Sequence, residues 1–245
     1  WYDVVARYWW RNRSSARSTT PAARVESFYD RAGTGFGMIE EGGSVTVVLA
    51  LEPARPDLAD CPDDELALAL SPLLTFAGGR DVRPAELRLV TRVVGAPTAR
   101  GDGRSRPAVS YREVAPGQPV AQRSVWVCLR LDPAWCPEAV AARGGGAEGA
   151  RRALASLAAR LAAAVEPPLR LRALGLEEVR ALHRSMPDLS GEAVERFTGV
   201  EADGTYRGYR VDSWGGTDLP ALVRAVAGAG ALVVQASVSL RPLPA

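Results

Sequence analysis

Alternation of apolar and polar residues predicts most of the β-strands of this chain. The clearest case is Gln122–Leu131, where every second residue is apolar and would lie on one face of a sheet. Gly35–Glu40 and Ser44–Leu51 predict a β-hairpin whose turn is formed by Glu41, Gly42 and Gly43. Further strands are expected within residues 85–95, 108–114, 169–175 and 231–244, and a further hairpin about Asp203–Gly204.

Apolar residues at helical spacing predict three helices. The strongest is Ala147–Val165, where Leu154, Leu157, Leu161 and Val165 fall on one face and two prolines follow. Residues 176–186 and 218–228 predict the other two. Strands and helices alternate along the chain, which predicts an α/β fold with one continuous mixed sheet and helices packed on it.

The first twenty residues combine aromatic rings with arginines, and we divide the chain there. Residues 1–20 are expected to be a juxtamembrane segment and linker, and residues 21–245 a single α/β domain. Tryptophan and tyrosine favour the membrane–water boundary, and arginine favours anionic head groups. The alternative is a helix that packs its aromatics on the domain's own surface. The expected membrane-proximal residues are Trp1, Tyr2, Arg7, Tyr8, Trp9, Trp10, Arg11 and Arg13, and residues 14–27 predict a linker.

Composition narrows the function classes. The formal net charge of the 245 residues is +2, which gives no reason to expect a nucleic-acid partner. No apolar run is long enough to span a membrane. The three cysteines are an odd number without a C-x-x-C spacing, which favours a reducing compartment over a disulfide framework, and we expect no metal site.

The glycine-rich stretch 143–152, RGGGAEGARR, could cradle a phosphate or could break a helix. The break is favoured because no lysine follows and Glu148 would stand where a phosphate charge should lie. Gly33, Gly35 and Gly37 lack the dinucleotide spacing and predict a close approach of another backbone. The acids of 57–65 are expected to begin a helix, with a divalent cation as the alternative. The lone His183 is expected to be a surface or packing residue, so no catalytic residue and no cofactor is predicted.

Four stretches resemble the soluble domain of EccE, a membrane-complex component of the type VII (ESX-type) secretion systems of actinobacteria. They are ARYWWRNR (6–13), the hairpin region 33–53, the strand and interrupted helix of 124–165, and TYRGYRVDSWGG (205–216). The resemblance implies a structural subunit that assembles with EccB, EccC and EccD in the inner membrane, and a fold similar to glycosyltransferases without an established activity. It also implies transmembrane helices upstream of Trp1, while the arginine bias and the free cysteines favour a cytoplasmic domain.

Two other functions are compatible with the sequence besides a non-catalytic scaffold. A glycosyltransferase-like enzyme using a nucleotide-sugar is the alternative, suggested by the α/β layout, with the acidic stretch 57–65 and the glycine-rich stretch 143–152 as its candidate features. Fold likeness alone does not establish such a function. A peripheral domain that binds anionic lipid through Arg7, Arg11, Arg13 and Arg17 is the third. Trp135 and Trp214 lie in loop-like stretches and are candidate partner contacts, unless they pack in the core of the domain.

Overall fold

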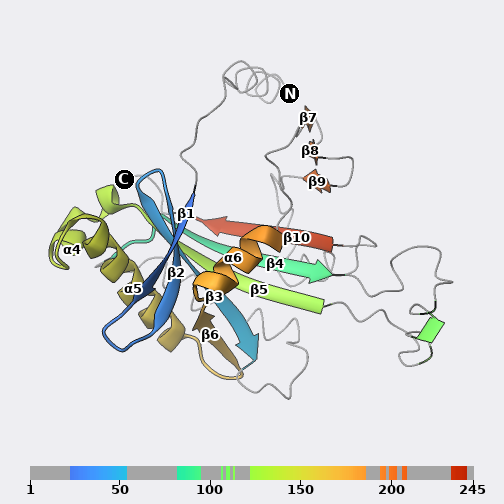
Figure 1. The fold of residues 1–245 in the computed structure, drawn as a ribbon, viewed down its shortest axis with the longest axis horizontal. Helices are drawn as coiled ribbons and strands as arrows, with labels where there is room; N and C mark the ends of the chain where they lie inside the picture. Colours follow the sequence, from blue (N-terminus) through green and yellow to red (C-terminus); the bar gives the residue numbers. More distant parts are fainter. Residues whose placement is uncertain are drawn as a thin grey trace, which may run out of the picture.

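A seven-stranded sheet organises the part of the chain that the computed structural model describes (Figure 1). Its strands follow the order β1–β2–β3–β5–β4–β10, and β6 also pairs with β3. The strands are β1 (Arg24–Tyr29), β2 (Gly35–Glu41), β3 (Ser44–Pro53), β4 (Glu86–Val94), β5 (Gln122–Leu131), β6 (Leu169–Ala173) and β10 (Val233–Leu240). The described residues are 23–53, 82–94, 106, 109, 110, 113, 122–185, 194–196, 199–202, 206–208 and 233–241.

Every strand pair of this sheet is antiparallel. The expectation of helices packed on a sheet is confirmed, whereas the mixed strand directions are not found. The sheet is also not the only one, because β7 (Val194–Arg196), β8 (Gly199–Ala202) and β9 (Tyr206–Gly208) form a separate three-stranded sheet. The hairpin expected about Asp203–Gly204 is confirmed by the antiparallel pairing of β8 and β9.

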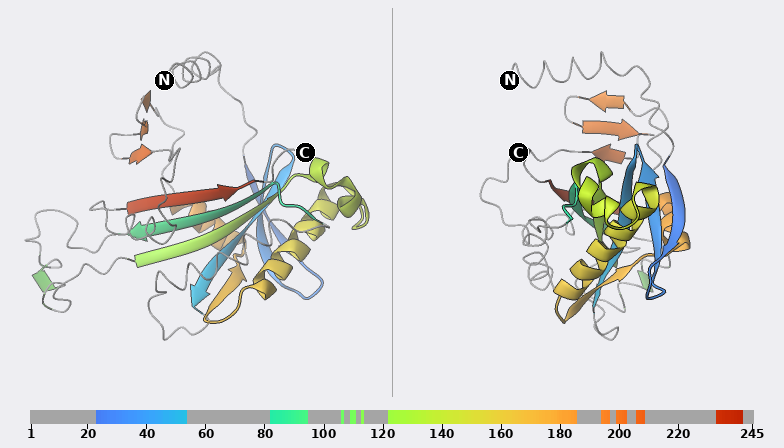
Figure 2. Two further views of the ribbon diagram at one scale, coloured as in Figure 1. Left: turned by 180° about the vertical axis from the view of Figure 1, so that it is seen from behind. Right: turned by 90° about the vertical axis from the view of Figure 1, so that its left-hand side faces the viewer.

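Helices cover the two faces of the large sheet from opposite sides. Helix α5 (Gly146–Ala164) lies on one face, and α6 (Leu176–Ser185) lies on the other (Figure 2). A 3₁₀ turn, Pro133–Trp135, and a short helix, α4 (Pro137–Ala141), connect β5 to α5. The hairpin of β2 and β3, the long amphipathic helix and the helix that contains His183 are confirmed close to their expected bounds.

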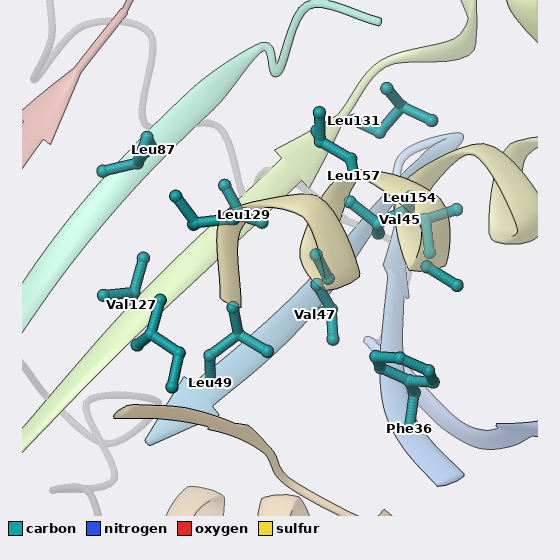
Figure 3. Close-up of a cluster of buried hydrophobic side chains, with 14 of the residues drawn as sticks. Phe36, Val45, Val47, Leu49, Leu87, Val127, Leu129, Leu131, Leu154 and Leu157 are labelled. Atoms are coloured by element: carbon teal, nitrogen blue, oxygen red, sulfur yellow. The ribbon is translucent and has the colours of Figure 1, made fainter. Parts of the chain in front are cut away.

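The main core lies between α5 and the sheet. Leu154, Leu157 and Leu161 of α5 are at most 1% exposed and face Val47, Leu129 and other side chains of the strands (Figure 3). Alanines fill the helix positions between these leucines, which lets the helix lie close to the sheet. The predicted apolar faces of β5 and α5 are therefore the two surfaces that meet in this core.

Gly37 of β2 lies against the connection between β6 and α6 and against Val179 of α6. Its N–H donates to the carbonyl oxygen of Leu174 at 2.7 Å, and a Cβ atom at Gly37 would lie 2.8 Å from the carbonyl oxygen of Gly175. The predicted close approach of another backbone is thus confirmed at Gly37, and it explains why a residue without a side chain stands there. The same prediction is wrong for Gly33 and Gly35, because a Cβ atom at Gly33 would meet no described atom within 4 Å and one at Gly35 would meet the side chain of Tyr29.

Two local predictions were wrong. The linker expected over residues 14–27 gives way to strand β1 from Arg24 onward, because Val25 and Phe28 each reach an apolar cluster on one face of the sheet. Within the strand expected at 108–114, the described residues Val109, Ser110 and Glu113 are helical instead. Both stretches are short and rich in polar residues, so their apolar periodicity was too weak to decide.

Several predictions lie outside the described residues. They concern the membrane-proximal residues Trp1 to Arg13, the acidic stretch 57–65, the helix expected at 218–228, and Trp214.

Candidate functional site

The glycine-rich stretch 143–152 turns the chain between α4 and α5. Gly144, Gly145 and Gly146 all have positive φ angles, of 102°, 70° and 58°, which residues with a side chain rarely adopt. Gly149 lies one turn into α5, where a Cβ atom would approach the carbonyl oxygen of Val140 to 2.5 Å. The predicted break in the helix is confirmed, and Gly149 allows the two helical pieces to pack closely.

The charged side chains of this stretch bind groups of the protein itself. Glu148 pairs with Arg152 at 3.1 Å across one helical turn. Arg152 also donates to the carbonyl oxygen of Arg143 at 3.2 Å, and Arg143 donates to the carbonyl oxygen of Ala139 at 2.9 Å. These contacts favour a structural role for the arginines over a phosphate cradle, which would need them to converge on one external anion.

An open hollow of about 790 Å³ lies beside the glycine break. Its apolar lining includes Val45, Val140 and Ala150, and the turn between β2 and β3 forms part of its rim. Arg24 and Glu41 are its exposed charged residues. The hollow thus lies between the start of β1 and the connection from β5 to α5.

Arg151 fastens α5 to the first two strands. Its guanidinium lies 2.5 Å from a carboxylate oxygen of Glu26 on β1 and 2.6 Å from one of Glu40 on β2. The side chain of Arg151 is only 22% exposed, and the hydrogen bond that it donates to Glu40 is the main cause that raises its pKa. No local pattern predicts this ionic clamp, because the two glutamates lie more than a hundred residues away from the arginine.

A second ionic network lies on the α6 face of the sheet. Arg172 binds Glu52 at 2.9 Å and Glu178 at 3.0 Å, and Arg170 binds Glu52 at 3.2 Å. Glu178 also accepts the backbone N–H of Gly175, so it caps the first turn of α6. Burial alone would raise the pKa of Glu52, but the hydrogen bonds and charges of Arg172 and Arg170 outweigh it and hold that pKa below its usual value.

Glu86 of β4 is a buried carboxylate that pairs with two arginines. Its side chain accepts from Arg88 at 2.9 Å and lies 3.4 Å from Arg241. Burial works to raise the pKa of Glu86, but hydrogen bonds from Ser239 and Arg88, with the charges of Arg88 and Arg241, lower it overall. Glu86 is therefore held as a paired carboxylate at neutral pH, which favours a structural role.

The described cysteines are free and poorly suited to nucleophilic chemistry. Burial raises the pKa of Cys128 to about 11, and burial is also the main cause of the raised pKa of Cys136. Both thiols therefore stay protonated at neutral pH, whereas the thiolate is the reactive form. Within the ranges that the structure describes, no group of three or more His, Cys, Asp and Glu residues gathers as a metal site.

Trp135 is the predicted contact residue that the structure describes. It is 55% exposed at the end of the 3₁₀ turn, so the alternative of packing in the core is wrong for this residue. Asp132 caps the turn by accepting the N–H of Ala134 at 3.0 Å, which fixes the backbone that presents the indole. The other predicted site residues lie in undescribed parts of the chain, so the structure brings none of them together with Trp135.

Comparison with known protein families gives a match to part of the chain. Among the described residues, no helix is long and apolar enough to cross a membrane. No curated protein matches the chain. Residues 119–211, which include β5, α4, α5, β6 and α6, match the family described as "Putative type VII ESX secretion system translocon, EccE". The resemblance to EccE is thereby confirmed over residues 119–211.

Proposed function

We propose that this chain is part of a non-catalytic structural subunit of a type VII secretion membrane complex. The match of residues 119–211 to the EccE family carries this proposal. We further propose that upstream transmembrane helices anchor the subunit in the inner membrane, that residues 21–245 form one domain facing the cytoplasm, and that the partners are EccB, EccC and EccD.

The geometry of the glycine-rich stretch supports a scaffold. Its glycines turn the backbone, and Gly149 closes the contact between α4 and α5. Its arginines are engaged by Glu148 and by backbone carbonyl groups. A site that stabilises a transition state needs donors that remain available to the substrate.

Co-purification of the full-length protein tests the assembly. An affinity-tagged copy extracted from its native membrane with mild detergent is expected to elute together with EccB, EccC and EccD. Elution of the tagged protein alone, from membranes that contain the other three subunits, would contradict the proposal. The residues encoded directly before Trp1 are expected to contain one or two apolar stretches of about 20 residues.

Calorimetry tests the absence of catalysis. Titration of the chain with UDP-sugars and manganese at millimolar concentration is expected to give no saturable heat. Saturable binding followed by release of UDP would show a transferase and would end the proposal of a purely structural role.

A further inference from the structure

The hollow beside the glycine break has an exposed aromatic ring at its rim. Pro133 and Pro137 both line the hollow, and Trp135 stands between them along the chain, at the end of the 3₁₀ turn. The indole is 55% exposed and is not among the residues that line the hollow. One face of the molecule therefore carries a projecting aromatic ring and, beside it, a recess that this ring does not fill.

The lining of the hollow suits an aromatic side chain. Val45, Val140 and Ala150 are the buried part of this lining, whereas Pro137 and Ala147 are exposed. A volume of about 790 Å³ lies within the range of pockets that admit a small molecule, so the hollow has room for an indole. Tryptophan buries a large apolar area and is enriched among the residues that anchor protein interfaces.

The rim of the hollow carries exposed charges of both signs. Arg24 is 75% exposed, and it binds Glu26 of its own strand at 2.6 Å, which leaves further N–H donors of the guanidinium for a second carboxylate. Glu41 is exposed at the turn between β2 and β3. Glu40 also lines the hollow, but Arg151 already binds it. An exposed cation and an exposed carboxylate on one rim make this face complementary in charge to itself.

We propose that the hollow is the docking site of a second copy of this chain, in a twofold symmetric dimer that inserts Trp135 of each copy into the hollow of the other. In this dimer Arg24 of one copy faces Glu41 of the other, and the symmetry repeats the pair. A twofold contact uses the same patch on both copies, so the patch must hold a projection and a matching recess. This face holds both, whereas an unrelated partner would have to supply each feature independently.

The contact is small, so the dimer is expected to be weak. Each copy contributes one aromatic anchor and two charged rim residues, and interfaces of this size belong to transient complexes. We expect a dissociation constant of about 10–100 µM at physiological salt. The proposal concerns the folded part of the chain and does not depend on the proposed membrane complex.

Sedimentation equilibrium of the 245-residue chain tests the aromatic contact. The unaltered chain is expected to pass from monomer to dimer between about 5 and 500 µM. Trp135→Ala removes the projection, and Ala147→Trp fills the recess from an exposed position, so each is expected to weaken the dimer about tenfold. Tyr29→Ala removes a ring that is 68% exposed at the far end of β1, and it is expected to change nothing. Circular dichroism checks that every variant is folded.

Exchange of the rim charges tests the symmetry. Arg24→Glu alone sets carboxylates against each other across the dimer, and Glu41→Arg alone sets guanidinium groups against each other. Each single variant is therefore expected to dimerise about fivefold more weakly. An equimolar mixture of these two variants has an opposite-charge pair at both positions, so its heterodimer is expected to regain the affinity of the unaltered chain. Arg31→Glu, in the turn after β1, is the control with an exposed charge outside the hollow.

Three results would overturn the proposal. The first is an unaltered chain that stays monomeric at about 500 µM. The second is a dimer of equal affinity in the Trp135→Ala and Tyr29→Ala variants, and the third is a mixture of the two charge variants that dimerises no better than either alone. A monomeric chain whose Trp135→Ala variant, in the full-length protein, loses its partner subunits would assign the hollow to another subunit and would also overturn the dimer.

Discussion

The two faces of the large sheet are stabilised in different ways. The cluster under α5 contains 25 buried residues among those described, whereas the cluster under α6 contains four, Val48, Ala50, Leu174 and Val179. Each face also has an ion-pair network: Arg151 binds Glu26 and Glu40 on the α5 face, and Glu52, Arg170, Arg172 and Glu178 form the network of the α6 face, where ion pairs make up a larger share of the contacts because the apolar cluster is small. Apolar burial does not depend on pH, whereas the strength of ion pairs does. The two faces are therefore expected to respond differently to truncation of an apolar side chain and to a change of pH.

The largest effect is expected from Leu157→Ala on the α5 face. Leu157 is 1% exposed in the centre of the core, so its truncation removes buried methyl groups and leaves a cavity. The free energy of unfolding in urea is expected to fall by about 2–5 kcal/mol. Leu182→Ala on the α6 face, where the side chain is half-buried, is the comparison and is expected to cost less. Equal losses would show that the two faces are packed alike.

The next largest loss of stability is expected when a methyl group is added at either of two close helix contacts. Gly149→Ala and Gly37→Ala place a Cβ atom 2.5 Å and 2.8 Å from a backbone carbonyl oxygen. Each variant is expected to lose about 1–3 kcal/mol of unfolding free energy in urea. Alanine normally stabilises a helix interior by about 1 kcal/mol relative to glycine. A gain in stability for Gly149→Ala would therefore show that α4 does not pack against α5 as described.

A smaller difference is expected between the two ionic networks. Arg151 is 22% exposed and Arg172 is 42% exposed. Arg151→Gln is expected to cost about 1–2 kcal/mol of unfolding free energy, because it removes the cation that Glu26 and Glu40 share and leaves only the exposed Arg24 beside Glu26. Arg172→Gln is expected to cost less than about 1 kcal/mol, since exposed pairs are screened by solvent. A larger loss of unfolding free energy for Arg172→Gln than for Arg151→Gln would show that the stronger ionic network lies on the α6 face.

The smallest effect on stability is expected from a fall in pH, and it acts through carboxylates on the α6 face of the sheet. The pKa values of Glu52 and Glu86 are lower in the folded chain than the ordinary value. A group with a lowered pKa stabilises the fold above its unfolded pKa, and this stability is lost as the pH falls through the folded value. Urea unfolding is therefore expected to show declining stability below about pH 4.5. The slope is expected to flatten in Glu52→Gln, and an unchanged slope in that variant would assign the effect to other carboxylates.

Local features of this fold could be predicted from the sequence, whereas long-range pairings could not. The alternation in Gln122–Leu131 and the spacing of leucines in α5 each depend on one stretch of chain, and both are confirmed. The glycine break is also local, because three successive positive φ angles leave few residues other than glycine. Strand β1 was missed because its polar edge position weakens the apolar pattern.

The candidate site shows the same limit. Exposure of Trp135 agrees with its prediction as a contact residue, but which molecule it contacts depends on surfaces that no local pattern encodes. The clamp of Arg151 on Glu26 and Glu40 joins residues more than a hundred positions apart. Its geometry follows from the register between β1 and β2 and from the docking of α5, which are properties of the assembled sheet.

The central position of β3 has a consequence for how the chain can be divided. One edge of β3 pairs with β5, and the other pairs first with β2 and then with β6. Strands β5 and β6 lie inside the stretch that matches the family, but both pair with β3, which precedes that stretch. A fragment of residues 119–211 would lack β3, the strand that joins β5 and β6. The smallest unit that folds by itself must therefore include at least the hairpin of β2 and β3.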